Sequence, residues 1–160
     1  MRRIITTLCV VGLMAAGATV AAAAIPPPNR SFHGSGTNAE NQGGRWVSHG
    51  IRSFSLTTSS RQYYAVKKFR MYIKSFRSTY VSTCNGTKRV AASNILIHPN
   101  GSFSFSFFSH GAAVRIWGQF TGRGDIAHVN YLVNFKGSST NPGGLNSSCA
   151  TWVHGTAFEG

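Results

Sequence analysis

Apolar residues recur at every second position through the middle of the chain, which is the periodicity of a strand with one buried face. The clearest example is the segment from Ser102 to Phe107, where serine and phenylalanine alternate without interruption. The turn sequence at 98–101, His-Pro-Asn-Gly, comes directly before it, and Ile95 and Ile97 stand before that turn. This arrangement predicts a β-hairpin with one phenylalanine-rich face.

Two further segments, 114–120 and 127–135, show the same alternation on either side of a glycine-containing turn at 121–125. Together with the first hairpin they predict an antiparallel meander. Upstream strands are less regular, and we expect them around 54–56, 69–73 and 80–84, with a last strand from Cys149 to Ala157.

The pattern favours an all-β fold. After the N-terminal segment, no window shows a sustained helical spacing of apolar residues, and β-branched, aromatic and serine residues dominate. About eight strands fit an antiparallel β-sandwich, and a jelly-roll-like arrangement or a barrel is the alternative. The strand order is left open.

The N-terminal region is typical of an exported protein. Residues 1–24 combine two arginines, an apolar run and a closing series of alanines, which predicts a secretory signal peptide cleaved near Ala24. An uncleaved membrane anchor is the alternative. Residues 25–44 are rich in Pro, Gly and Asn and predict a flexible leader, so that 45–160 would form a single β domain. We expect the mature protein to be extracellular or associated with the cell envelope.

Two cysteines, Cys84 and Cys149, remain once the signal peptide with Cys9 is removed. In an oxidising compartment they are expected to form one disulfide. Free thiols or an intermolecular bridge are the alternatives.

Several short motifs carry a resemblance. They are the Gly-x-Phe steps at 101–103 and 118–120, Cys84-Asn85-Gly86, and the terminal Cys149-Ala150-Thr151 followed by Trp152. In these features residues 45–157 resemble small secreted actinobacterial β-sandwich proteins, most of them uncharacterised. The resemblance implies export, one disulfide and an antiparallel sandwich, and it assigns no catalytic or ligand-binding residue.

Charge narrows the choice of function. The 160 residues include 16 Lys and Arg but only three Asp and Glu, which gives a formal net charge of +13. The acids are Glu40 in the expected leader, Asp125 in a turn and Glu159 beside the C-terminus. A two-carboxylate glycosidase mechanism is therefore disfavoured, and no Gly-x-Ser-x-Gly elbow is present. We expect a protein without catalytic residues or cofactor, and the dispersed histidines predict no metal site.

The bases are concentrated between Glu40 and Asp125, a stretch that holds twelve Lys and Arg and no acid. On a strand through Phe69, Met71 and Ile73, the opposite face would carry Lys68, Arg70, Tyr72, Lys74 and Phe76. The predicted anion-binding residues are Lys67, Lys68, Arg70, Lys74 and Arg77, and the predicted aromatic platforms are Tyr72 and Trp117. The alternative is that these bases lie on a solvent-exposed strand face and have no ligand, where they discourage the edge strands of two protein molecules from pairing.

The function expected from these features is non-catalytic binding of anionic envelope or extracellular polymers. The partner classes are an anionic polysaccharide, a wall phosphate polymer or an anionic membrane surface, and nucleic acid is a less favoured class. One alternative is a neutral-carbohydrate-binding module that uses Trp46, Tyr64, Tyr72 or Trp117. Another is a secreted toxin or membrane-active protein.

Overall fold

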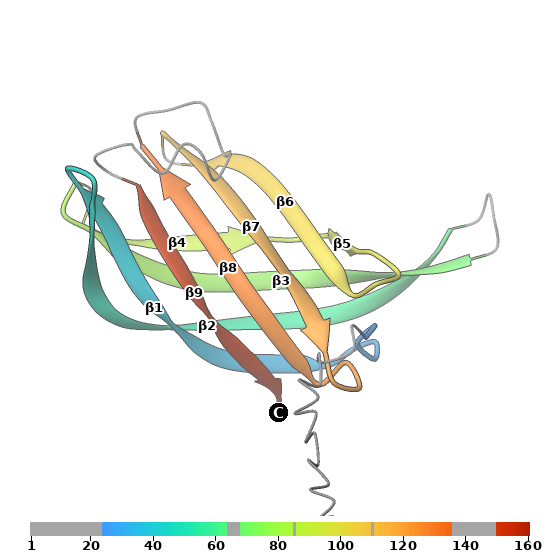
Figure 1. Cartoon of the computed structure of the whole chain (residues 1–160). Coiled ribbons are helices and arrows are strands. Elements are labelled where there is room, and N and C mark those ends of the chain that lie inside the picture. The colour runs from blue at the N-terminus through green and yellow to red at the C-terminus, as the bar shows by residue number, and fades with distance from the viewer. Residues whose placement is uncertain (1–23, 64–67, 85, 110, 136–149) are drawn as a thin grey trace, which may run out of the picture.

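The computed structural model describes residues 24–63, 68–84, 86–109, 111–135 and 150–160, and every regular element in these ranges is a strand (Figure 1). The strands are β1 (Ser31–Gln42), β2 (Arg45–Tyr63), β3 (Lys68–Ser82), β4 (Gly86–Ala92), β5 (Ile95–Ile97), β6 (Ser102–Ser109), β7 (Ala112–Thr121), β8 (Ile126–Asn134) and β9 (Thr151–Glu159). The prediction of an all-β antiparallel fold is confirmed. Residues 1–23 of the expected signal peptide, Lys67 and Cys149 lie outside the described residues.

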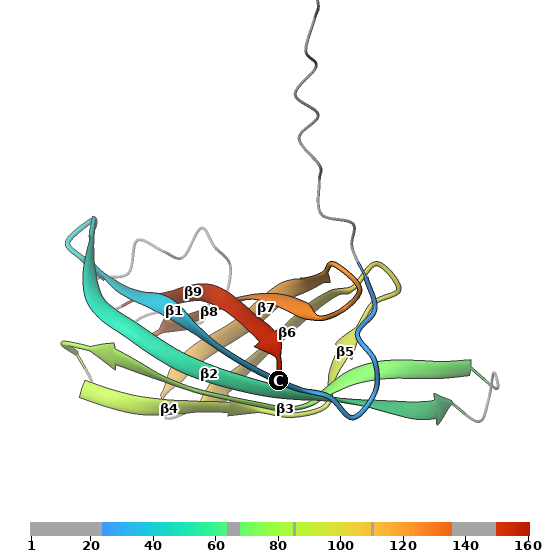
Figure 2. The ribbon, with the colours of Figure 1, turned by 90° about the horizontal axis from the view of Figure 1, so that it is seen from below.

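The strands pair in the order β2-β1-β9-β8-β7-β6-β5-β3-β4, and β2 pairs in addition with β3. The hydrogen-bonded pairings therefore form a continuous circuit of eight strands, from which β4 branches at β3. The predicted meander is confirmed as β5 to β8, each strand antiparallel to the next. Seen from below, β2, β3 and β4 form one layer and β6 to β9 lie above it (Figure 2).

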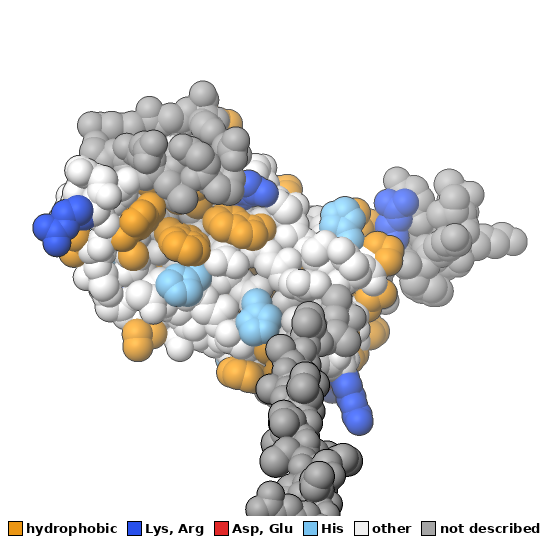
Figure 3. All heavy atoms as spheres, viewed as in Figure 1, with side chains coloured by type: hydrophobic (Ala, Val, Ile, Leu, Met, Phe, Trp, Pro, Cys, Tyr) orange, Lys and Arg blue, Asp and Glu red, His pale blue; other side chains and the backbone are white. Residues whose placement is uncertain are grey.

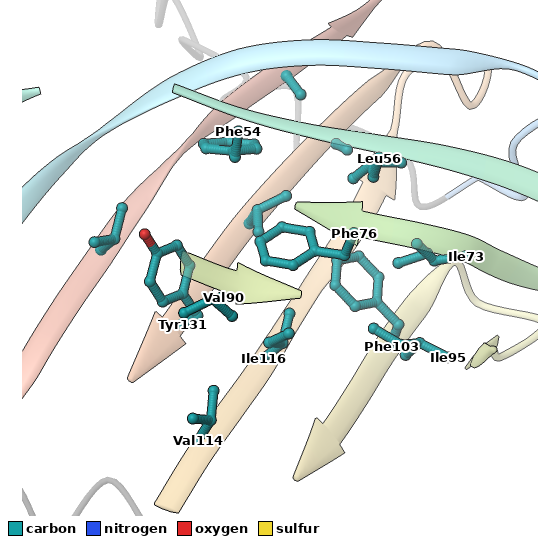
Figure 4. Packing of buried hydrophobic residues seen from close by; sticks show 14 of the residues in the cluster. Phe54, Leu56, Ile73, Phe76, Val90, Ile95, Phe103, Val114, Ile116 and Tyr131 are labelled. Atoms are coloured by element: carbon teal, nitrogen blue, oxygen red, sulfur yellow. The ribbon is translucent and has the colours of Figure 1, made fainter. Parts of the chain in front are cut away.

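Between these layers lies a core of aromatic and branched side chains (Figure 4). Phe54, Ile73 and Phe76 come from the β2–β3 side, whereas Ile116 and Tyr131 come from β7 and β8. The alternation read from the sequence is confirmed in the middle of β7 and the first half of β8, whereas at the end of β8 the residues on both sides, Leu132 and Asn134 included, are buried. β7 and β8 thus each contribute an apolar face to the core, and burial of such faces is the main stabilising term.

One predicted face is wrong. The sequence pattern placed Phe76 with the lysines on the outer side of its strand, but Phe76 is fully buried, as is Ile73 three residues earlier. The cause is an irregularity in the β2–β3 register: Thr58 lies opposite Ile73 and Thr57 opposite Ser75, so Lys74 is an extra residue. A β-bulge of this kind reverses the side-chain alternation beyond it.

The predicted flexible leader is also wrong over most of its length. Residues 31–42 form β1, which pairs with β2 on one side and with β9 on the other. Before it, Asn29 N–H donates to the carbonyl of Thr58, and Ala24 N–H donates to the carbonyl of Phe120. The β domain therefore begins well before residue 45.

Replacing a core phenylalanine tests this packing. Phe76→Ala should lower the free energy of unfolding by about 3–5 kcal/mol, because it leaves a cavity between the two layers. The control is Phe108→Ala, since Phe108 is 69% exposed and its loss should change stability by less than about 0.5 kcal/mol. Urea unfolding followed by circular dichroism measures both, and equal effects would contradict the assigned core.

Candidate functional site

The predicted anion-binding residues follow β3, but the structure does not gather them into one ribbon. Lys67 lies outside the described residues, and Lys68 is described only as the first residue of the β3 backbone. Arg70, Lys74 and Arg77 have exposed side chains. Each of these three lines a different hollow on the surface.

The hollows differ in size and in what they combine with the base. Arg70 lies beside Leu96 and His98 in a hollow of about 300 Å³. Lys74, the extra residue of the bulge, lies with Arg30 in one of about 230 Å³. Arg77 belongs to the largest, an open groove of about 770 Å³.

This largest hollow, which we call the basic groove, crosses the outer side of four strands. A straight row of facing residues runs His33, Ser55, Arg77 and Ala91 across β1, β2, β3 and β4. Arg89 of β4 also lines the groove and lies opposite Thr79 of β3. The lining thus offers two guanidinium groups, an imidazole and hydroxyl groups, and it contains no carboxylate.

None of the chain's three acids can neutralise this groove. Glu40 is fully buried. Asp125 accepts a hydrogen bond from the backbone N–H of Arg123 in the β7–β8 turn, and Glu159 lies 3.2 Å from the Arg30 guanidinium. The bases at the groove therefore have no carboxylate partner, and the field there is positive.

The buried Glu40 joins three parts of the chain. Its carboxylate accepts hydrogen bonds from the Ser82 hydroxyl and from the Thr83 backbone N–H and hydroxyl, at the end of β3. The same carboxylate also accepts a hydrogen bond from the Gln42 side chain, and its Oε2 lies 3.0 Å from His49 Nε2. His49 reaches it from an irregularity in β2, where Thr37 lies opposite Ile51 and Ala39 opposite Ser48.

These contacts decide the protonation state of Glu40. Burial by itself raises the pKa of the carboxyl, but the hydrogen bonds from Ser82, Thr83 and Gln42 outweigh burial and lower the pKa to about 2. The group is therefore charged at neutral pH and remains so until the pH falls towards about 2. It is a structural anion, although the sequence placed it in a flexible leader.

A second surface feature lies on the other layer, on the outer side of β9, β8 and β7. Trp117, one of the predicted platforms, is partly exposed there, with the Arg115 guanidinium 5.2 Å from its ring centre. Trp46 and Trp152 meet edge to face at 6.1 Å, and His154 packs 4.9 Å from Trp152. Tyr72, the other predicted platform, lies on β3 and is separated from this group by several strands of the sheet. The Arg61 guanidinium lies 5.8 Å from the centre of its ring.

Figure 3 views this side of the molecule, where hydrophobic and histidine side chains gather over β9, β8 and β7. The Lys and Arg side chains visible in this view lie mainly at its margins, and no Asp or Glu side chain shows. We call the group formed by Trp46, Trp117, Trp152 and His154, with Asn130 and Arg115 beside them, the aromatic face.

Sequence reasoning did not assign Arg89, His33 or Trp152 to a site. His33 lies in the segment that was expected to be a leader, so only recognition of β1 would have placed it. Arg89 was counted among the acid-free bases, but its position beside Arg77 requires the β3–β4 pairing.

The described residues include no group of three His, Cys, Asp or Glu that could hold a metal ion. In the same residues no helix is long and apolar enough to cross a membrane. Comparison with protein-family models, curated proteins and solved structures gave no match.

The depressed pKa of Glu40 predicts an acid-sensitive fold. Its contribution to stability is complete above the ordinary carboxyl pKa of 4.5 and is lost as the pH falls towards about 2. This loss should amount to about 3 kcal/mol between about pH 5 and pH 2. In Glu40→Gln this part of the pH dependence should be absent, and the variant should be less stable than the parent protein at pH 7.

Glu159→Gln is the matched control, because Glu159 pairs with Arg30 in a more exposed position. Urea unfolding at a series of pH values measures all three proteins. If Glu40→Gln loses stability between pH 5 and pH 2 as steeply as the parent protein, the assignment of Glu40 is wrong.

Proposed function

We propose that the protein is a non-catalytic binder of anionic polymers and that the basic groove is its principal contact surface. The observation that carries this proposal is the pair Arg77 and Arg89 in one groove without a carboxylate. Guanidinium groups bind phosphate, sulfate and carboxylate through paired hydrogen bonds as well as charge. The hydroxyl groups of Ser53 and Ser55 on β2, which also line the groove, add neutral donors.

The shape of the groove favours an extended ligand. It is open to solvent and crosses four neighbouring strands, which at about 4.8 Å per strand spacing span roughly 15 Å. Lys74, beside Thr57 and Thr58, and Arg70, beside His98, line further hollows along β3. A polymer with repeated negative charges can contact several of these groups, whereas a single small anion reaches only one hollow.

A solvated strand face with bases as edge guards explains exposed lysines, but it explains the groove less well. Edge protection requires bases at the outermost strand, which is β4 here. Arg77 lies on β3, whose strand neighbours are β2, β4 and β5. Arg89 lies on β4 and fits edge protection, but Arg77 protects no edge, so this explanation does not account for the pair.

Several features of the expected protein form part of the proposal. The closed circuit of pairings supports a flattened barrel more than two separate sheets, because β1–β9 connects the layers on one side and β5–β6 connects them on the other. Export follows from the N-terminal sequence alone. An anionic polysaccharide or a wall phosphate polymer is the favoured ligand of an exported protein.

A disulfide between Cys84 and Cys149 also belongs to the proposal. Cys84 N–H donates to Ser82 Oγ, whose own hydroxyl reaches Glu40. Ala150, the residue after Cys149, accepts a hydrogen bond from Asn41 N–H. The chain on either side of the proposed bridge thus approaches two adjacent residues of β1, which supports this pairing.

Binding to long-chain polyphosphate tests the groove. The double variant Arg77→Gln, Arg89→Gln should bind roughly tenfold more weakly at about 0.1 M salt, and the slope of log affinity against log salt should fall by about one to two. Biolayer interferometry over a salt series gives both values.

The double variant Arg45→Gln, Arg123→Gln is the control, since it removes the same charge from two exposed positions outside the groove. It should retain most of the affinity. Equal weakening by both pairs would mean that net charge alone attracts the polymer, and no binding by the parent protein near 0.15 M salt would reject the proposal.

The disulfide has its own test. The double variant Cys84→Ser, Cys149→Ser should unfold with a free energy lower by about 4 kcal/mol, because a long loop is no longer closed in the unfolded chain. The unreduced, denatured parent protein should show no reactive thiol from these two residues in a thiol titration. Two reactive thiols would exclude the bridge.

A further inference from the structure

All three tryptophans of the chain lie on one outer side of the molecule, away from the core. The chain contains Trp46, Trp117 and Trp152 and no other tryptophan. The core, in contrast, is built from Phe, Tyr and aliphatic side chains. Trp46 is exposed, and Trp117 and Trp152 are partly exposed. Large rings that reach the surface in this way are typical of binding surfaces, where tryptophan offers a wide apolar face at low entropic cost.

The strand register brings these rings together from distant parts of the sequence. On β1, Asn41 pairs with Trp46 of β2, and Ala39 pairs with Trp152 of β9. Trp46 and Trp152 therefore lie diagonally across β1 from each other. Trp117 lies opposite Asn130, and Asn130 lies opposite His154. Because directly paired residues in an antiparallel sheet point to the same side, all of them share one face.

Polar side chains lie beside the rings on this face. One row across β1, β9, β8, β7 and β6 reads Thr37, His154, Asn130, Trp117 and Ser104. The next row reads Ala39, Trp152, Leu132, Arg115 and Ser106. Along the first row, rings and hydrogen-bonding side chains therefore follow one another at the strand spacing of about 4.8 Å. In the second row the buried Leu132 lies between Trp152 and Arg115.

We infer that the aromatic face binds a polysaccharide, with sugar rings stacked on the tryptophans and their hydroxyl groups bonded to the polar side chains between. A sugar chain offers an apolar C–H face and a polar rim in every residue, which matches the sequence of rings and polar side chains along the first row. Trp46, at 39% exposure, extends the surface beyond β9. The Arg115 guanidinium beside Trp117 supplies donors for a ring hydroxyl or a ring carboxylate.

This surface is separate from the basic groove. It lies mainly on β9, β8 and β7, whereas the groove crosses β1 to β4. Its contacts depend on stacking and hydrogen bonds and so persist at high salt, unlike those of the groove. The two surfaces can therefore be tested independently of each other.

Intrinsic fluorescence is a direct probe because every tryptophan of the protein belongs to this face. The probes are cellohexaose, chitohexaose and a hyaluronate hexasaccharide, titrated at about 1 M NaCl, where the Debye length falls to about 3 Å. We expect at least one of them to shift the emission saturably. The two neutral sugars and the acidic one distinguish ring stacking alone from stacking assisted by Arg115.

Trp152→Ala and Trp46→Ala should each weaken binding about tenfold, while thermal unfolding checks that both variants remain folded. Trp152→Tyr should recover part of the affinity, because it restores a ring. Phe158→Ala is the control: this residue is 58% exposed on the same strand but outside the aromatic face. Arg77→Gln, Arg89→Gln should bind the sugars like the parent protein.

The inference is overturned if none of the three sugars shifts the emission, or if binding is unchanged in both tryptophan-to-alanine variants. Vesicles of phosphatidylglycerol serve as a further arm. An emission shift with these vesicles and with no sugar would assign the face to a membrane surface and would also overturn the inference.

Discussion

The structure depends on a buried polar contact between β1 and β3. Asn38 of β1 is fully buried and exchanges two hydrogen bonds with the backbone of Val81, as a neighbouring strand would. Two residues further along, the Glu40 carboxylate receives the Ser82 hydroxyl and the N–H of Thr83. A carboxylate without such donors costs several kcal/mol to bury, so β1 is stable only when the end of β3 is in place.

This contact also shapes the outer surface. Of the three acids in the chain, Glu40 is buried inside the protein. Asp125 accepts a hydrogen bond in the β7–β8 turn, and Glu159 pairs with Arg30. Arg77 and Arg89 of the basic groove consequently have no carboxylate beside them, and the positive field of the groove is a result of where the acids lie. Net charge, which the sequence gives directly, becomes informative about binding only after this distribution is known.

The strands with a regular alternation of apolar and polar residues were predicted from the sequence. The strands without this alternation were predicted poorly or missed. Strands β6 to β8 were predicted because apolar and polar residues alternate along them almost without exception. β1 was missed because its inward positions after Phe32 are Gly34, Gly36, Asn38 and Glu40, which give no apolar signal. The glycines are required by packing, since a Cβ at Gly34 or Gly36 would collide with the backbone of β9.

The candidate surfaces show the same limit at the level of side chains. Arg77 was assigned from sequence, but its partner Arg89 and the bulge that buries Phe76 follow from pairings between strands. The aromatic face combines Trp46 and Trp152, which are far apart in the chain and adjacent only because β1 lies between β2 and β9. Since the missed strand is the one that brings them together, recognising β1 is the step that turns scattered aromatic residues into a surface.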